Sequence, residues 1–243
     1  GMSSLNIDGN PKTNYDDPSS TPMDIVLASF SCDGTYRWSK IIGGGDTEVI
    51  SAVQVDSQDN VYIAGRILSC DDGTALYPFP ARIDNDYVFV NSPSACSRLF
   101  LAKFNTNGIL QYVKRPEPNL TNSPSFASFG FELQNDVIYW FVWLKPGTYS
   151  DGALINTNTD PQTPFVLRYN LDGSFIEGVQ LGTFQFNGAV DSTRYYRNPY
   201  NGNYYMTCIK TSSSTTLTIN GQLVVNAAAL VCYDANGNYL WKR

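Results

Sequence analysis

Short apolar stretches alternate with polar turns along this chain, and the pattern repeats. Four segments align without a gap, and each places an aromatic residue four positions before a glycine that directly follows Asp or Asn. The segments are residues 25–38, 99–112, 164–177 and 228–241, with turn glycines Gly34, Gly108, Gly173 and Gly237 and aromatic residues Phe30, Phe104, Tyr169 and Tyr233. Glycine accepts the positive φ that a tight turn between two strands needs. Each segment is therefore predicted to form a β-hairpin.

A second repeated piece lies between these hairpins. Residues 52–65, 129–142 and, more loosely, 194–207 each consist of a strand, a polar turn and another strand. One unit therefore holds four strands, a and b from this piece and c and d from the glycine-turn hairpin. A further apolar-polar segment lies between b and c, and we expect it to form an extra short strand or an ordered excursion. It is found at residues 5–9 and 217–221, and in degenerate form near 76–83 and 153–156.

The strands favour a propeller-like packing over a two-sheet sandwich. Residues 25–28 and Val137–Leu144 are apolar at both odd and even positions, which predicts sheets covered on both faces. Blades packed face to face around an axis meet this demand, whereas the outer face of a sandwich normally meets water. We expect an all-β fold, a β-propeller-like array of four-stranded antiparallel blades with insertions between strands b and c.

Residues 24–65 resemble a known repeat. The sequences DIVLASFSCDGTYRWSKIIGGG and VDSQDNVYIAG are similar to the bacterial β-propeller repeat called the SBBP repeat, which occurs in exported and surface proteins, many from Bacteroidetes. Later units keep the pattern less well, and the third has Glu177 where the repeat has Trp. The resemblance covers nearly all of the chain. It implies a propeller in the periplasm or at the cell surface of a bacterium, and this extracytoplasmic location rests on the resemblance alone because no signal-peptide pattern is seen.

The repeats predict one domain over residues 1–243. Its units are a partial blade at 5–48 and complete blades at 49–116, 117–181 and 182–243. Three and a half blades do not close a ring, since propellers use about four to eight. We therefore expect an incomplete ring, with three alternatives for its completion: further blades from a longer chain, a homodimer, or a small ring closed by irregular N-terminal strands.

Composition excludes several kinds of chemistry. The chain has no histidine, so a Ser-His-Asp triad, a Cys-His dyad and a histidine-based metal site are all excluded. Its net charge is -6 and its Lys and Arg residues are scattered, which argues against nucleic acid as a partner. No apolar run reaches the roughly 18 residues that span a bilayer. We predict no metal site, no cofactor and no membrane span.

Paired carboxylates remain as candidates for glycosidase-type chemistry. The pairs are Asp16 with Asp17, Asp46 with Glu48, and Asp71 with Asp72. Each pair lies in a turn-like stretch rich in Gly or Pro, where acidic side chains serve as solvated turn formers. We therefore predict no catalytic residue. An Asp-Gly or Asn-Gly turn followed four residues later by Trp also resembles the tryptophan-docking motif of quinoprotein dehydrogenase propellers, where it has a structural role.

The five cysteines leave the disulfide state open. They are Cys32, Cys70, Cys96, Cys208 and Cys232. One interpretation is that all are buried thiols that pack as small hydrophobic residues. The other is that Cys70 pairs with Cys96 and Cys208 with Cys232, since each pair falls on the adjacent strands b and c, which leaves Cys32 free.

Tyrosines supply the candidate binding residues. Tyr195, Tyr196, Tyr200 and Tyr204 cluster around a turn that contains Asn and Gly, and flat rings with a polar edge suit sugars and protein partners. Binding is also expected in the loops between strands b and c, at residues 66–97, 144–163 and 209–226. We predict a non-catalytic propeller scaffold or binding module that presents loops to a carbohydrate or protein partner. The alternative is a propeller enzyme of carboxylate or quinoprotein type.

Overall fold

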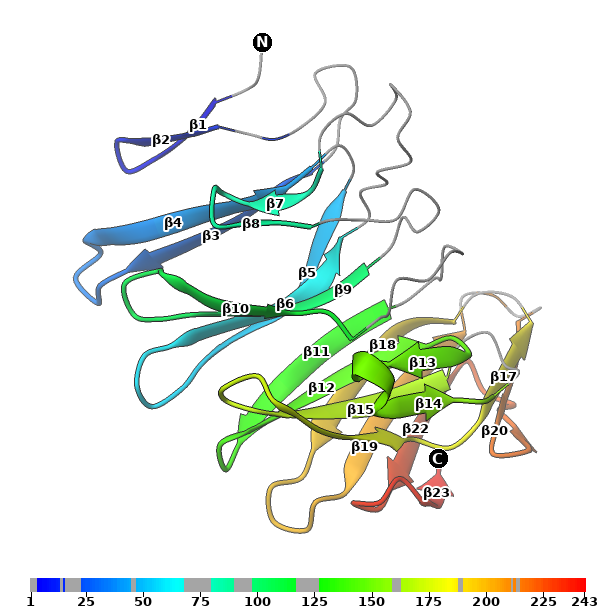
Figure 1. The fold of residues 1–243 in the computed structure, drawn as a ribbon. Helices are drawn as coiled ribbons and strands as arrows, with labels where there is room; N and C mark the ends of the chain where they lie inside the picture. Colours follow the sequence, from blue (N-terminus) through cyan, green and yellow to red (C-terminus); the bar gives the residue numbers. More distant parts are fainter. Residues whose placement is uncertain are drawn as a thin grey trace. The chain divides into compact units, whose positions relative to one another are not determined.

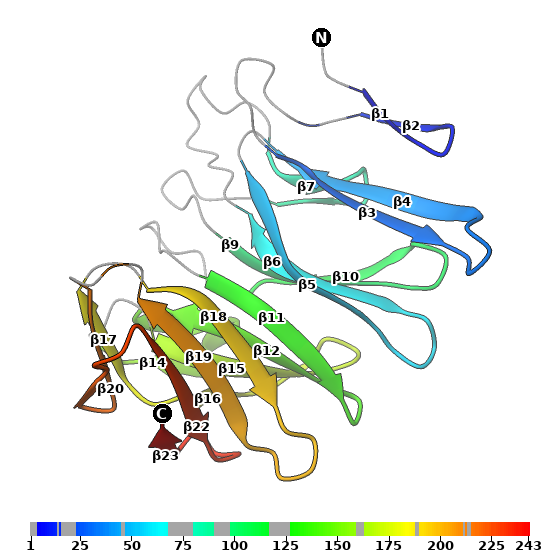
Figure 2. The ribbon, with the colours of Figure 1, turned by 180° about the vertical axis from the view of Figure 1, so that it is seen from behind.

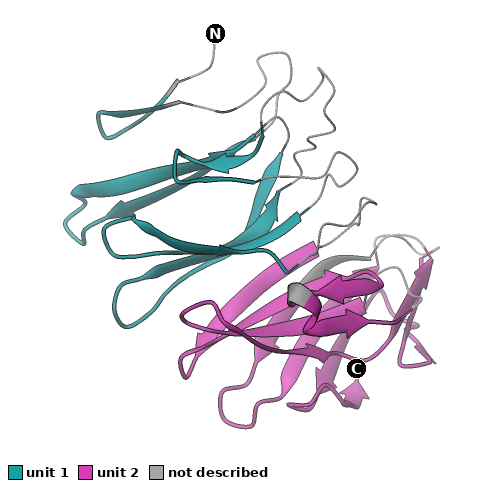
Figure 3. Cartoon of the chain, in the orientation of Figure 1, with its two compact units in different colours: residues 1–124 teal, residues 125–243 magenta. Residues whose placement is uncertain are grey.

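The fold is all-β (Figure 1). The computed structural model describes residues 4–13, 15, 23–44, 47–67, 80–89, 98–116, 127–158, 163–187, 190–210, 212 and 215–243. Contacts divide the chain into two compact units, residues 1–124 and residues 125–243 (Figure 3). Each unit is described by itself, and the single domain predicted over residues 1–243 stays a prediction. Among the described residues, no helix has the length and apolar character needed to cross a bilayer.

The first unit contains two four-stranded antiparallel sheets and a separate hairpin. Sheet 1 has the order β3-β4-β7-β8, with β3 at Ile25–Phe30, β4 at Tyr36–Gly43, β7 at Arg82–Ile83 and β8 at Tyr87–Val88. Sheet 2 has the order β5-β6-β9-β10, with β5 at Glu48–Val55, β6 at Val61–Ile67, β9 at Arg98–Phe104 and β10 at Leu110–Lys114. The hairpin consists of β1 at Ser4–Ile7 and β2 at Asn10–Thr13.

The second unit contains two more such sheets, seen from behind in Figure 2. Sheet 3 has the order β11-β12-β15-β16, with β11 at Ala127–Gln134, β12 at Val137–Leu144, β15 at Thr163–Asn170 and β16 at Phe175–Gln180. Sheet 4 has the order β18-β19-β22-β23, with β18 at Val190–Arg197, β19 at Tyr204–Lys210, β22 at Ala228–Tyr233 and β23 at Tyr239–Lys242. The smaller elements are β13 at Gly147–Tyr149, the 3-10 turn η1 at Ser150–Gly152, β14 at Leu154–Asn156, β17 at Phe184–Asn187, β20 at Thr216–Ile219 and β21 at Gln222–Leu223.

Sheets 2, 3 and 4 have the strand order a-b-c-d that the sequence predicts. Sheet 1 differs, because its c–d hairpin is extended on the d side by β7 and β8. These two strands come from the excursion between strands b and c of sheet 2. The excursion of sheet 4 behaves in a similar way, since β20 pairs with β17, which directly follows the d strand of sheet 3. The predicted excursions therefore form short strands, and that of sheet 2 joins the preceding sheet, whereas β1–β2 and β13–β14 are separate hairpins.

The four glycine-turn hairpins have one geometry. Their turn glycines have φ between +74° and +85°. In every hairpin the glycine N–H donates to the carbonyl oxygen three residues earlier, at 2.9 to 3.0 Å. Each hairpin also has a shift in strand register at the same place. The shift lies between the pair that the aromatic residue of strand c forms with strand d and the pair that the preceding residue forms. The prediction of four copies of one hairpin is confirmed.

In the first unit, Trp38 on strand d of sheet 1 packs on the turn of sheet 2. Its indole Nε1 donates to the carbonyl oxygen of Thr106 at 3.0 Å. A Cβ added to Gly108 would lie 2.6 Å from Cδ2 of Trp38, so the ring occupies the space that a side chain would need. The ring centroid of Trp38 also lies 6.0 Å from that of Phe104. We use the name turn contact for this packing of a side chain from one sheet against the glycine turn of the next sheet in the same unit.

In the second unit, a different side chain makes the turn contact. Glu177 lies where sheet 1 has Trp38, and it forms an ion pair with its cross-strand neighbour Arg168. The Arg168 guanidinium donates from Nη2 to the carbonyl oxygen of Ala235 at 2.9 Å, and Ala235 precedes Gly237 as Thr106 precedes Gly108. The loss of the repeat's Trp is thus compensated, because an arginine donates to the equivalent carbonyl.

Burial only partly follows the expectation that both faces of every sheet are covered. Strand β12 does so, because seven of its eight residues are buried. Strand β3 does not, since Val26 and Phe30 are 43% and 46% exposed. The apolar residues of β3 that are better covered, Ile25 and Leu27, pack against the core shared by sheets 1 and 2.

Of the two interpretations of the cysteines, the disulfide between Cys208 and Cys232 is wrong, and burial of all five thiols is also wrong because Cys32 is exposed. Cys208 and Cys232 are free thiols, and Cys32 is free as well. Cys208 is paired in register with Ala229, three residues from Cys232, so the two thiols lie on opposite faces of the sheet. Burial raises the pKa of the Cys208 thiol to about 12. The predicted pair Cys70 and Cys96 lies outside the described residues.

Candidate functional site

The structure separates the four tyrosines that the sequence singles out. Tyr195 stacks on Phe141 at 5.0 Å between ring centroids and belongs to the core between sheets 3 and 4. Tyr204 is fully buried in the same core. Tyr196 and Tyr200 are 51% and 96% exposed. Only these last two can contact a ligand, and the binding site predicted at this hairpin stays a prediction for them.

The candidate carboxylates and loops are only partly described. Asp16, Asp17, Asp46, Asp71 and Asp72 lie outside the described residues. Glu48 is 4% exposed and begins strand β5, so the prediction that it is a solvated turn former is wrong. Most of the predicted binding loop at residues 66–97 also lies outside the described residues, but its residues 80–89 help to form a polar pocket in the first unit. Most of the predicted loops at 144–163 and 209–226 is described and forms β13, η1, β14, β20 and β21.

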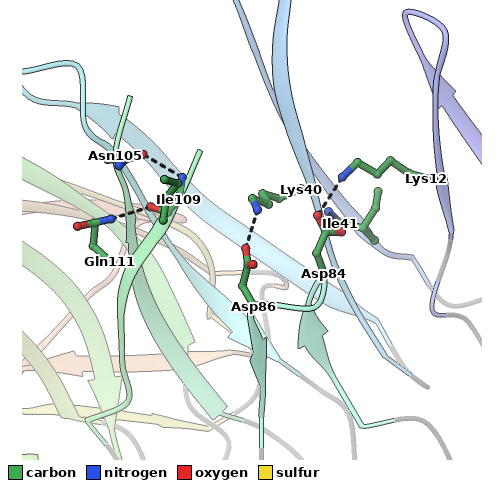
Figure 4. Close-up of polar contacts among 8 residues, drawn as sticks. All are labelled: Lys12, Lys40, Ile41, Asp84, Asp86, Asn105, Ile109 and Gln111. Atoms are coloured by element: carbon green, nitrogen blue, oxygen red, sulfur yellow. Dashed lines mark hydrogen bonds and ion pairs between the residues drawn. The ribbon is translucent and has the colours of Figure 1, made fainter. Parts of the chain in front are cut away.

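This pocket has a volume of about 350 Å³ and lies where three segments of the first unit meet. Figure 4 shows Lys12 from the β1–β2 hairpin, Lys40 and Ile41 from β4, and Asp84 and Asp86 from the turn between β7 and β8. The pocket is lined by Pro11, Lys12, Tyr15, Lys40, Asp84, Asn85 and Asp86. These residues are far apart in the sequence, so the fold alone brings them together.

Asp84 holds the pocket together. It adopts a φ of +41°, which Asp tolerates better than most residues because its short polar side chain can bond locally. Its Oδ1 accepts a hydrogen bond from the Ile41 N–H at 3.0 Å, and its own N–H donates to the Ile41 carbonyl oxygen at 2.8 Å. Its Oδ2 accepts from Lys12 Nζ at 3.0 Å. Asp84 therefore attaches the β7–β8 turn to β4 and to the β1–β2 hairpin.

The other charges of the pocket are also paired. Lys40 Nζ donates to Asp86 Oδ2 at 2.5 Å. The Arg82 guanidinium lies 5.1 Å from the centroid of the Tyr15 ring, and the Tyr15 backbone N–H donates to Asp24. Burial and the negative charge of Asp84 raise the pKa of the Tyr15 hydroxyl, so it stays a neutral donor and acceptor at physiological pH. The pocket thus offers ammonium, amide and hydroxyl donors beside carboxylate acceptors.

Such an arrangement can bind a polar, uncharged molecule. Polyols need donors and acceptors side by side, and paired lysines and aspartates supply both without an excess of charge. Proton transfer is less suited to the pocket, because both oxygens of Asp84 already accept hydrogen bonds from the protein. The sequence predicted binding in the loop that holds Asp84 and Asp86, but it did not single out any residue of the pocket. Asp84 occupies the same place in its segment as Asp8 and Asn220, and all three have positive φ.

A scan against protein-family models and a search of curated proteins each found no match to this chain.

Proposed function

We propose that this chain is a non-catalytic scaffold of repeated sheets that binds a carbohydrate in the polar pocket of its first unit. The four hairpins with one turn geometry support the view that the sheets are blades of a propeller of the SBBP-repeat type. An exported bacterial protein at the cell surface or in the periplasm would meet glycans there. Location, propeller ring and ligand are all parts of this proposal.

The observation that carries the ligand proposal is the convergence of Tyr15, two lysines and two aspartates on one pocket. A sugar presents adjacent hydroxyl groups that donate and accept hydrogen bonds, and an apolar ring face that packs on aromatic rings. The pocket is also formed in part by the turn between β7 and β8, which is attached to a sheet. Binding residues are commonly found on loops that a rigid scaffold holds in place.

A glycan-binding screen with the whole chain, followed by calorimetry on each ligand found, tests the proposal. We expect a neutral oligosaccharide to bind. The double variant Lys40→Gln with Asp86→Asn should weaken that binding at least about tenfold, because it removes the charges from two hydrogen-bonding groups worth roughly 1.5–3 kcal/mol each when ionised. Asp84 is left intact in this variant because it attaches the turn to β4.

The control variant is Asp136→Asn, which neutralises an exposed carboxylate in the turn between β11 and β12 of the second unit. Asn keeps the tolerance of positive φ that this position, at +61°, requires. It should bind the oligosaccharide as the unaltered chain does. An absence of glycan binding would refute the proposal, and so would equal binding by the pocket variant and the control.

A further inference from the structure

In both units, one face of the earlier sheet packs on the opposite face of the later sheet. In the first unit, Leu27 and Trp38 of sheet 1 join a core with Phe100 and Phe104 of sheet 2. In the second unit, Val166 and Val179 of sheet 3 join a core with Val231 and Tyr233 of sheet 4. Counted from the turn glycine of its own hairpin, Leu27 is equivalent to Val166, and Phe104 is equivalent to Tyr233. We call the face that carries Leu27 and Trp38 in sheet 1 the leading face of the repeat, and the face that carries Phe100 and Phe104 in sheet 2 its following face. A leading face contacts a following face once in each unit.

Sheet 4 also has a leading face, and the apolar side chains on it are exposed. Leu230 and Trp241 occupy the positions of Leu27 and Trp38, and they are 38% and 36% exposed, whereas Trp38 is 9% exposed. Ile209, on the neighbouring strand, is 40% exposed. A hollow of about 520 Å³ lies on this face, lined by Arg194, Thr207, Ile209, Ala228, Ala229, Leu230 and Arg243.

Sheet 1 carries the complementary following face, and it is open as well. Val26 and Phe30 occupy the positions that Phe100 and Phe104 occupy in sheet 2. Phe100 and Phe104 are fully buried, whereas Val26 and Phe30 are 43% and 46% exposed. The turn of this hairpin is also uncovered. Nothing lies within 4 Å of a Cβ added to Gly34, whereas the Trp38 ring covers the equivalent Gly108.

We propose that the leading face of sheet 4 docks on the following face of sheet 1 in a second copy of this chain. The two interfaces within the units supply the template. Trp241 then lies over Gly34, packs against Phe30 and donates from Nε1 to the carbonyl oxygen of Cys32, as Trp38 does to Thr106. Arg243, which lies 5.4 Å from the Trp241 ring centroid, comes near the exposed Asp33 of that turn. The proposal is independent of carbohydrate binding, because the polar pocket belongs neither to the leading face of sheet 4 nor to the following face of sheet 1.

The contact joins two different surfaces, so it is a head-to-tail interface. Sedimentation velocity with the full chain should show a mass that rises with concentration to at least twice that of the monomer. Leu230→Arg, which charges the leading face, and Val26→Arg, which charges the following face, should each stay monomeric. Their equimolar mixture should form dimers and nothing larger, because one intact face of each kind remains. Both substituted residues are more than a third exposed, so the variants should fold, as circular dichroism can show.

Val53→Arg is the control, because Val53 is a strand residue of sheet 2 that is 53% exposed and belongs to neither docking face, since those faces lie on sheets 4 and 1. It should associate as the unaltered chain does. A monomer at every concentration would overturn the proposal. Association that survives either face variant would also overturn it, since identical faces would then be pairing. Failure of the two folded variants to form dimers on mixing would overturn it too.

Labelling of Cys32 gives an independent readout, because this thiol is free and exposed and its backbone carbonyl belongs to the proposed contact. Peptide mapping after a short pulse of iodoacetamide should show Cys32 modified several-fold more slowly in concentrated than in dilute protein. In Leu230→Arg the rate should not change with concentration. Equal rates in dilute and concentrated unaltered protein would contradict the docked geometry.

Discussion

Trp38→Ala is expected to lower the free energy of unfolding of the first unit by about 3–5 kcal/mol, the usual loss when a buried aromatic residue is truncated. The indole ring lies over Gly108, contacts Phe104 and donates to the Thr106 carbonyl oxygen, so its removal leaves both a cavity and an unpaired acceptor. Urea denaturation followed by circular dichroism measures the loss.

Trp241→Ala is the matched control, because it removes the same side chain from the equivalent position of sheet 4. Its ring is 36% exposed and contacts Tyr205 at 6.1 Å between centroids. Measured in dilute protein, its loss should be smaller, about 2 kcal/mol, since about a third of the residue's surface lies in water. Equal losses in the two variants would mean that Trp38 contributes nothing through the turn contact.

Gly237→Ala is expected to destabilise the second unit by about 3 kcal/mol or more, from two causes. The positive φ of +85° costs a residue with a Cβ about 1–2 kcal/mol. The new Cβ would also lie 2.0 Å from the carbonyl oxygen of Gln180, so the backbone of strand d in sheet 3 would have to move. A thermal or urea unfolding curve for the variant would give the size of the loss.

Gly34→Ala separates the two causes. Gly34 has the same φ of +85°, but nothing lies within 4 Å of an added Cβ, so only the conformational cost of about 1–2 kcal/mol applies. We expect its loss to be clearly smaller than that of Gly237→Ala. If the two losses were equal, close approach of sheet 3 to the Gly237 turn would make no contribution to stability.

The hairpins could be predicted from the sequence because their chemistry is local. An Asp-Gly or Asn-Gly pair with an aromatic residue four positions before the glycine fixes the turn, whatever the hairpin packs against. The order of strands a to d in sheets 2, 3 and 4 follows from the same short-range pattern. The place of β7 and β8 could not be predicted in this way, because β7 pairs with β4, a strand about 40 residues earlier in the chain, and β8 pairs with β7.

The turn contact of the second unit could be anticipated only in part. The replacement of Trp by Glu177 is visible in the sequence, but its compensation by Arg168 depends on a cross-strand pair and on a carbonyl group of the next sheet. Alternation along β18 could have separated Tyr195 from Tyr196, since successive side chains of a strand point to opposite faces. The sequence does not say which of the two faces is buried.

The sequence predicts the polar pocket only in part, because Asp84 and Asp86 lie in the predicted binding loop 66–97 but Lys12 and Lys40 do not. Lys12, Lys40 and Asp86 come from three segments whose approach depends on tertiary packing, and no local spacing links them. Lysines and aspartates in turns are also the commonest solvated residues, so their types alone carry no signal.

The central claim, that the hairpins are copies of one module and that the turn contact within each unit is the same contact, is tested most directly by exchanging its two versions. The double variant Arg168→Ser with Glu177→Trp gives sheet 3 the pair Ser29 and Trp38 of sheet 1. Arg168→Ser alone should cost about 2–3 kcal/mol, because it removes hydrogen bonds to the Ala235 carbonyl oxygen and the Tyr204 hydroxyl. If the modules are equivalent, the free energy of unfolding of the double variant stays within about 1 kcal/mol of the unaltered chain, since the new indole takes over the bond to Ala235. A double variant as unstable as Arg168→Ser, or less stable, would show that the sheets do not share one contact.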